Sequence, residues 1–163
     1  MNMNDDLRKT SLLFLIKKDE ILLAMKKRGF GAGRWNGVGG KPDPEEEIED
    51  TATRECEEEI NVTPIALKKV AKIDFLFPED KAAKGFNQQV HVFLCNEWEG
   101  DPEETEEMKP EWFKLDKVPY DEMWADDKFW LPLVIEGKTL KAEFTFDDND
   151  QVTKQNIVES PIE

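Results

Sequence analysis

Residues 47–60 constrain the fold most, because they combine a helical apolar stripe with a dense run of acids. On a wheel of about 100° per residue, four apolar side chains fall within about 120° of one another: Ile48, Ala52, Cys56 and Ile60. Glu59 falls between Ile48 and Ala52, inside that stripe. The pattern predicts an amphipathic helix that packs on a larger apolar surface and carries one carboxylate to the edge of the core.

Two more glutamates, Glu55 and Glu58, line the same edge of the predicted helix as Glu59. Carboxylates three or four positions apart repel each other by roughly 0.2–0.5 kcal/mol per pair, and burial strengthens the repulsion. A hard cation such as Mg²⁺ relieves it, because Mg²⁺ prefers carboxylate oxygens. Arg54 falls beside Glu58 and can hold that side chain in place. The alternative is a charged amphipathic helix without a site, which the position of Glu59 disfavours.

Short apolar runs and turn residues predict several strands and a second helix around the acidic one. The strands are expected at residues 11–16, 21–25, 35–38, 64–77, 88–98, 112–115, 140–146 and 151–158, and the second helix at 126–135. Residues 28–44 and 78–87 are expected to be mostly loop, and Asn61, which tolerates the left-handed conformation, is expected to end the acidic helix. Strands, local hairpins and two helices indicate an α/β or α+β sandwich with a mixed sheet.

Length and charge limit the function. The 163 residues suit a single domain, 1–163, with flexible ends expected at 1–9 and 159–163. The net charge of −15 argues against a nucleic acid polymer as partner, which needs a basic surface. One histidine and two unpaired cysteines exclude His-rich zinc sites and a disulfide framework, and they suit the cytoplasm. No apolar stretch approaches the ~20 residues of a membrane span, and none resembles a signal peptide.

The segment that begins at Gly40 resembles the Nudix box. Gly, Glu, Arg-Glu, an apolar residue, Glu-Glu and a final apolar residue stand at the family's spacing, as Gly40, Glu46, Arg54, Glu55, Cys56, Glu58, Glu59 and Val62. Asn61 replaces the glycine of the box, which its helix-ending role makes tolerable. Residues 25–41, 90–93, 107–113 and 123–133 are further similar to the Nudix enzymes that hydrolyse oxidised purine nucleoside triphosphates.

The resemblance implies the Nudix α/β/α sandwich with a mixed β-sheet and a reaction. Oxidised purine nucleotides such as 8-oxo-dGTP and 2-hydroxy-dATP would be hydrolysed to the monophosphate and pyrophosphate, with Mg²⁺ or, as a substitute, Mn²⁺. The metal ligands implied are the carbonyl of Gly39 and the side chains of Glu55, Glu58, Glu59 and Glu107. One of these four glutamates would act as the base, and which one is left open. Arg54 joins the catalytic set.

The resemblance also implies a purine pocket. Asn36 can donate and accept hydrogen bonds at a purine edge. Asp126 and Asp127 would read the base, and two adjacent buried carboxyls should share a proton. The alternative for Asp126 is a helix cap. The remaining predicted substrate-binding residues are Ser11, Lys26, Phe30, Val38, Gly39, Gly40, Lys41, Phe75, Gln88, Met108 and Trp124, whereas Trp130 is expected only to pack.

Gln88 stands where relatives carry a methionine, and the loop before it is longer, so the base preference stays open. A polar Gln88 is expected to add a hydrogen bond to the base. Other Nudix substrates, such as methylated purine or sugar-linked nucleotides, form one alternative. A non-catalytic domain that only binds a nucleotide or another partner forms a second, which the complete set of box glutamates disfavours. The expected partner is therefore a small nucleotide, and the expected state is a monomer.

Overall fold

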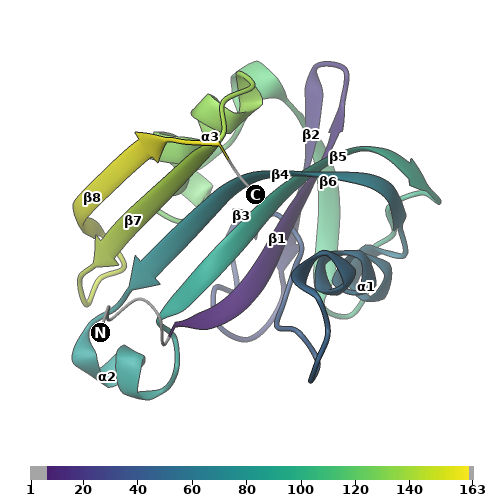
Figure 1. Cartoon of the computed structure of the whole chain (residues 1–163). Helices are drawn as coiled ribbons and strands as arrows, with labels where there is room; N and C mark the ends of the chain where they lie inside the picture. Colours follow the sequence, from purple (N-terminus) through teal and green to yellow (C-terminus); the bar gives the residue numbers. More distant parts are fainter. Residues whose placement is uncertain (1–6, 162–163) are drawn as a thin grey trace.

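The computed structural model describes residues 7–161, which form a mixed sheet with helices (Figure 1). The strands are β1 (Arg8–Lys17), β2 (Glu20–Lys26), β3 (Trp35–Asn36), β4 (Thr63–Leu76), β5 (Gln88–Glu99), β6 (Met108–Lys114), β7 (Leu140–Phe146) and β8 (Val152–Glu159). The helices are α1 (Ile48–Ile60), the short α2 (Glu79–Ala83) and α3 (Asp127–Ile135), and 3₁₀ turns lie at Leu115–Lys117 and Tyr120–Glu122.

The strand order is β3-β2-β1-β5-β4-β7-β8, and β6 pairs with β2. β1 runs parallel to β5 and β4 parallel to β7, while the other neighbours are antiparallel. The predicted mixed sheet and its two hairpins, β1–β2 and β7–β8, are therefore confirmed. The parallel pairing places the first strand of the chain beside residues 88–95, in the middle of the sheet.

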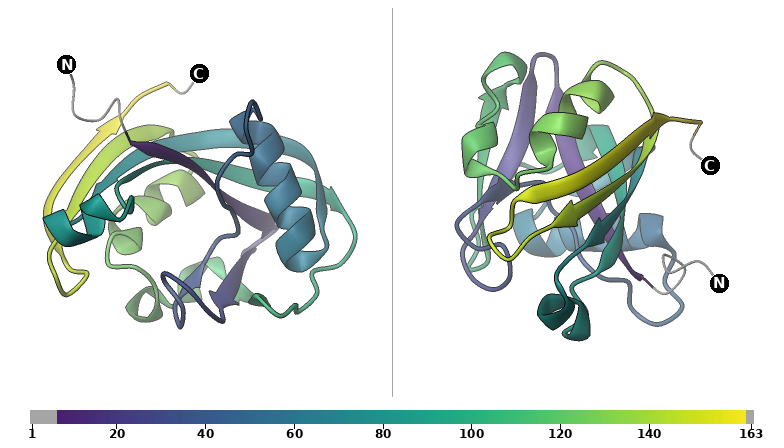
Figure 2. Two further views of the ribbon diagram at one scale, coloured as in Figure 1. Left: turned by 90° about the horizontal axis from the view of Figure 1, so that it is seen from below. Right: turned by 90° about the vertical axis from the view of Figure 1, so that its left-hand side faces the viewer.

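Alternation along the central strands divides the core between the two faces of the sheet. Phe14 of β1 packs in the same cluster as Trp130 of α3. The next residue, Leu15, faces the other way and packs in the cluster that holds Cys56 and Ile60 of α1. α1 and α3 thus cover opposite faces of the sheet, which is the predicted sandwich. The two helices lie well apart in the views of Figure 2.

Several predicted boundaries differ from the structure, and the strand expected at 35–38 is only Trp35–Asn36. The loop at 78–87 contains the short helix α2, and the strand expected at 112–115 begins earlier, at Met108. Within the ends expected to be flexible, 1–9 and 159–163, Arg8 and Lys9 pair with β5 and Glu159 pairs with Leu140, and the flexibility itself stays a prediction. Residues 1–6 and 162–163 lie outside the described residues. The pairing of Arg8 and Lys9 joins parts of the chain that are far apart in the sequence, so a local sequence pattern does not record it.

Between residues 7 and 161, no helix is long and apolar enough to cross a membrane.

Candidate active site

A cavity of about 360 Å³ is lined by the central strands, the glycine-rich loops and the start of α3. Every predicted substrate-binding residue except Val38 lines it: Ser11, Lys26, Phe30, Asn36, Gly39, Gly40, Lys41, Phe75, Gln88, Met108, Trp124, Asp126 and Asp127. Of the predicted glutamates of α1, Glu59 reaches the same lining. The cavity therefore joins the glycine pair and Glu59 to the paired aspartates within one space.

Val38 lies outside the cavity, so its predicted contact with substrate is not supported. Its side chain is buried in the core beneath α1, and its backbone forms a bridge with Leu13 through hydrogen bonds of 2.7 and 3.0 Å. Val38 instead fixes, by its bridge to β1, the segment after β3 that leads into the glycine pair.

Gly39 and Gly40 are needed because the loop approaches two other parts of the chain closely. A Cβ atom on Gly39 would lie 1.9 Å from the carbonyl oxygen of Ser11, and one on Gly40 would lie 2.6 Å from the carboxylate of Glu55. Ser11 holds the loop further, because its Oγ accepts a hydrogen bond from the backbone N–H of Gly40 at 3.3 Å. The glycine pair thus docks between β1 and α1, directly beside the acids.

Glu59 is buried, as its place in the apolar stripe predicts, with 6% of its surface exposed. Its Oε2 accepts a hydrogen bond from the backbone N–H of Gly39 at 3.2 Å. Burial, and then the charge of Glu55, raise the pKa of Glu59 to about 8. Burial likewise raises the pKa of Glu55. Glu55 and Glu59 thus lie side by side, and each resists ionisation. A bound hard cation would stabilise the charged form of both, so the two carboxylates fit as ligands of such a cation.

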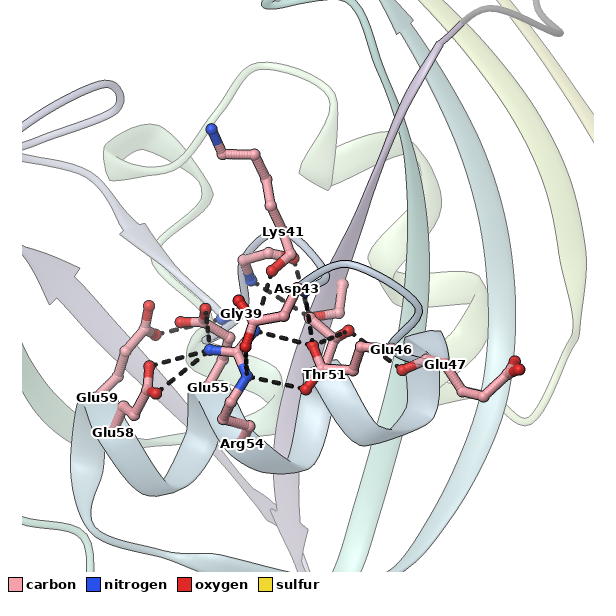
Figure 3. A network of polar contacts seen from close by, with 12 residues as sticks. Gly39, Lys41, Asp43, Glu46, Glu47, Thr51, Arg54, Glu55, Glu58 and Glu59 are labelled. Atoms are coloured by element: carbon pink, nitrogen blue, oxygen red, sulfur yellow. Dashed lines mark hydrogen bonds and ion pairs between the residues drawn. The ribbon is translucent and has the colours of Figure 1, made fainter.

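Arg54 organises the acids around the glycine loop, as Figure 3 shows. Its Nε and Nη2 donate to the two oxygens of Glu46 at 2.9 and 3.0 Å, a bidentate pair. Its Nη1 reaches Glu55 at 3.0 Å and Glu58 at 3.2 Å, while Nη2 also donates to the carbonyl of Lys41 at 3.0 Å. Arg54 is therefore a positioning residue, and Glu46, matched in the Nudix box without a role, is its principal anchor.

The predicted metal ligands do not all meet. Glu58 is turned toward Arg54 and its side chain is 58% exposed. Glu107 lies just before β6, 3.9 Å from the guanidinium of Arg28, and is near enough for its charge to raise the pKa of Glu59. Across residues 7–161, no group of three acidic, histidine or cysteine side chains is placed so that it could hold a metal ion. The structure brings Gly39, Glu55 and Glu59 together, and the fuller set stays a prediction.

Asp126 and Asp127 are buried at the start of α3, with 3% and 2% of their surfaces exposed. Burial raises the pKa of Asp126 to about 6, and burial together with the charge of Asp126 raises the pKa of Asp127 well above its ordinary value. These shifts favour the neutral form of at least one carboxyl, and the predicted sharing of a proton between the two stays a prediction. Within residues 7–161 the Oδ2 of Asp127 has no hydrogen-bond partner, although it is buried and Asp127 lines the cavity, so its capacity to bond a ligand is free.

Asp126 does not cap α3 through its side chain. Its Oδ2 instead accepts a hydrogen bond of 2.7 Å from the indole N–H of Trp130. The packing role expected for Trp130 is therefore incomplete, because its ring is buried in the core while its nitrogen orients the aspartate. The four-residue spacing from Asp126 to Trp130, one helical turn, is a sequence signal that points to this contact.

Aromatic rings form one wall of the cavity. Trp124 packs 5.2 Å from Phe30 and 5.8 Å from Phe146, measured between ring centres. Phe75 lines the cavity and also stacks at 5.9 Å on Phe144, so it serves both the pocket and the core. A planar base can stack on such a wall. Phe77 lines the cavity too, and the strand period of two from Phe75 is the signal that could have revealed it.

Two amides lie at the cavity with part of their hydrogen-bonding capacity engaged. The Oδ1 of Asn36 accepts a hydrogen bond from the N–H of Gly37 at 2.9 Å, which leaves its Nδ2 to donate to a ligand. The Oε1 of Gln88 accepts from the hydroxyl of Thr10 at 3.0 Å, and its Nε2 donates to the carbonyl of Phe86 at 3.2 Å. Gln88 thus supports the wall around Phe86, and the expected bond to a base stays a prediction.

Further cavity residues escape the sequence patterns, because they come from loops and strand ends. Thr10, Arg34, Phe86 and Phe146 line the cavity, and none of them belongs to the Nudix box. Their positions depend on how the loops fold over the sheet.

Comparison with protein-family models matches residues 6–134 to the NUDIX domain. The chain is 41% identical to the oxidized purine nucleoside triphosphate hydrolase of Mus musculus and 40% identical to that of Danio rerio, over 149 residues that cover 91% of this chain and 93% of each relative. A MutT protein of known structure from Bacillus halodurans superposes with a TM-score of 0.80 at 25% identity, over 95% of this chain and 100% of that one.

The family prediction is confirmed on two independent grounds. The matched domain includes the glycine pair, α1 and the paired aspartates, and the solved MutT structure shares the arrangement of the whole fold. The chain therefore belongs to the Nudix hydrolase family.

Proposed function

We propose that this Nudix hydrolase converts oxidised purine nucleoside triphosphates, including 8-oxo-dGTP and 2-hydroxy-dATP, into the monophosphate and pyrophosphate. The observation that carries the proposal is the buried pair Asp126–Asp127, with an unpartnered oxygen beside the aromatic wall of Trp124. A flat base with several donors and acceptors matches such a surface. The names of the mouse and zebrafish relatives support the same substrate class. Removal of such nucleotides would sanitise the nucleotide pool and limit DNA damage.

The part of the cavity lined by Gly39, Gly40 and Glu59 suits the triphosphate. Nudix hydrolases generally use divalent metal ions, and we propose Mg²⁺ here, with Mn²⁺ as a substitute. Glu55, Glu59 and the carbonyl of Gly39 would hold it, with Glu58 and Glu107 as further ligands. When bound, the cation would neutralise phosphate charge and polarise the P–O bonds.

The remaining chemistry falls to the chain itself. Lys26 and Lys41 line the cavity and offer positive charge to the phosphates. One of the glutamates 55, 58, 59 and 107 takes a proton from the water that attacks a phosphorus of the α–β linkage. The bond between that phosphorus and the α–β bridging oxygen breaks, and the products are the monophosphate and pyrophosphate. Arg54 acts indirectly, because it fixes Glu55 and Glu58 relative to the glycine loop.

The aspartate pair would read the base through its proton. A protonated carboxyl donates a hydrogen bond and an ionised carboxyl accepts one. Movement of the proton between Asp126 and Asp127 would let one pocket accept both an oxidised guanine and an oxidised adenine. We expect Asp126→Asn and Asp127→Asn to change the ratio of activities on 8-oxo-dGTP and 2-hydroxy-dATP. Activity close to wild type on both nucleotides, in both variants, would contradict this.

Pyrophosphate release in the presence of Mg²⁺ tests the main proposal. The substrates to compare are 8-oxo-dGTP, 2-hydroxy-dATP, O6-methyl-dGTP, dGTP and dATP, with Glu59→Gln as the inactive control. A preference of about tenfold for a modified purine requires about 1.4 kcal/mol of transition-state discrimination and would support the proposal. Turnover without preference would point to general nucleotide hydrolysis. Binding without turnover would revive the non-catalytic alternative.

We also propose a location and a partner class. Both cysteines, Cys56 and Cys95, are buried free thiols, which agrees with the reducing cytoplasm. The net charge of −15 disfavours nucleic acid polymers, so the partner is the small nucleotide itself.

A further inference from the structure

Three loops meet at the carboxylate of Asp150. This residue lies at the tip of the β7–β8 hairpin, which Figure 1 places beside α2. Its Oδ2 accepts a hydrogen bond from Arg34 Nη2 at 3.0 Å, and its Oδ1 accepts one from Lys81 Nζ at 2.6 Å. Arg34 follows β2 and Lys81 belongs to α2, so one carboxylate ties together segments that are 116 and 69 positions away in the sequence.

Both cations also lie on aromatic rings of the cavity wall. The guanidinium of Arg34 stands 4.2 Å from the ring centre of Trp124, and the ammonium of Lys81 stands 5.9 Å from that of Phe77. Such contacts are attractive because the ring face is electronegative. Arg34, Trp124 and Phe77 line the cavity, whereas Asp150 does not. Asp150 therefore acts on the wall from outside it.

The same cluster supports Phe86, a further part of that wall. The backbone N–H of Phe86 donates to the carbonyl of Lys81 at 3.1 Å, so the ring is tied to α2. Phe86 stacks almost parallel on Phe30, with 4.3 Å between ring centres and 10° between planes. Gln88 also donates to the carbonyl of Phe86, so a second hydrogen bond holds the segment that follows α2.

The hairpin turn presents Asp150 in a defined conformation. Its φ of 58° is left-handed, a region that aspartate tolerates better than most residues. Asp147 shapes the turn by accepting hydrogen bonds from the N–H groups of Asn149 and Gln151, at 2.8 and 3.0 Å. Burial opposes ionisation of Asp150, but Lys81 and Arg34 outweigh it and lower its pKa. The three charged side chains are between 21% and 33% exposed, so water screens them only in part.

We propose that Asp150 is a positioning residue for base recognition, which holds Arg34 and Lys81 so that Trp124 and Phe86 keep the rim of the purine cavity narrow. Asp150 touches no substrate itself. The inference rests on the proposed function, since it takes the cavity as the purine site. If Trp124 and Phe86 move apart, the preferred base binds more weakly, while the glutamates around Arg54 stay in place.

The test compares Asp150→Ala and Asp150→Asn with Asp148→Ala, an exposed aspartate of the same turn. We expect the KM for the preferred modified purine to rise about five- to tenfold in both Asp150 variants, with kcat changed less than twofold. We expect Asp148→Ala to keep the wild-type KM. Asp150→Glu, which retains the charge, should recover part of the loss. The double variant Arg34→Ala/Asp150→Ala should raise KM by less than the product of the two single effects, because both single changes break the contact between Arg34 and Asp150 and only Asp150→Ala also frees Lys81.

A second readout needs no nucleotide. Acrylamide quenching of Trp124, taken as the difference between each protein and its Trp124→Phe derivative, should increase in Asp150→Ala and not in Asp148→Ala. Equal KM values and equal quenching in these two variants would overturn the inference, as would a fall in kcat at unchanged KM. If the wild type turns over no purine triphosphate, the proposed function fails, and the quenching still decides whether Asp150 holds the rim.

Discussion

Glu59 shows how a single residue can link burial to metal binding. Its carboxyl lies in the apolar stripe of α1, where burial and the neighbouring charge of Glu55 raise its pKa from 4.5 to about 8. Protons therefore bind more tightly to the folded protein than to the unfolded chain between these two pH values. The contribution of Glu59 to stability is complete below pH 4.5 and is lost as the pH rises through about 8.

We expect the metal-free protein to lose thermal stability as the pH rises from 5 to 8, and Glu59→Gln to lose less, because glutamine does not ionise. Mg²⁺ at pH 8 should stabilise the wild type more than the variant. Glu59→Gln should also reduce turnover at least about 100-fold, whether Glu59 acts as a metal ligand or as the base. The measurement is the unfolding temperature in EDTA and in Mg²⁺, together with pyrophosphate release.

Asp50→Asn is the matched control, since Asp50 is an exposed acid of the same helix. It should keep the wild-type dependence on pH and on Mg²⁺. Identical pH profiles for Glu59→Gln and the wild type would contradict the role assigned to burial.

At the scale of the element, α1 ends where the sequence predicts. Asn61 is the C-cap, with φ 60° and ψ 34°, and its backbone N–H donates to the carbonyl of Glu57 at 3.0 Å. The Nudix box usually has a glycine at this place, because glycine adopts the left-handed conformation easily. Asparagine tolerates the same conformation, so Asn61 can end the helix in its place. The end of α1 matters because Glu58 and Glu59 lie in its last turn.

Asn61→Ala should lower the free energy of unfolding by about 1 kcal/mol, since alanine resists the left-handed region. Asn61→Gly should change it by only a few tenths of a kcal/mol, even though it removes the side-chain hydrogen bond to Glu103. Urea unfolding of both variants measures the difference. Equal losses in the two would show that the contact with Glu103, and not the backbone conformation, stabilises this helix end.

For the whole molecule, charge and surface composition bear on association. The net charge of −15 makes copies of the chain repel one another at low salt. Among the described residues, the exposed large hydrophobic side chains are Ile65 on β4 and Val158 on β8, at 53% and 52% exposure. Two single side chains on different strands are far from the continuous apolar area that a stable dimer requires.

We therefore expect a monomer. Light scattering coupled to size exclusion should give a mass near 18.9 kDa at low salt and at high salt. Salt screens the electrostatic repulsion between copies of the chain. A monomer at high salt would therefore show that repulsion is not what keeps the copies apart. A mass near twice this value in either condition would contradict the expectation.

The sequence by itself determined the local features of this protein. The helical period placed Glu59 in a buried stripe, Asn61 at the helix end and the glutamates along one edge, because residues one turn apart share a face wherever the helix packs. Short apolar runs separated by turn residues predicted both hairpins. The Nudix box identified the family, since its spacing is itself a local pattern.

The tertiary structure alone decided which distant residues meet. Asp150 lies 116 positions from Arg34, and their contact depends on how two loops fold over the same end of the sheet. The burial of Val38 and the helix within the 78–87 loop depend likewise on neighbours from other strands. Such contacts arise from the packing of whole elements and the register of their pairing, which no local period records.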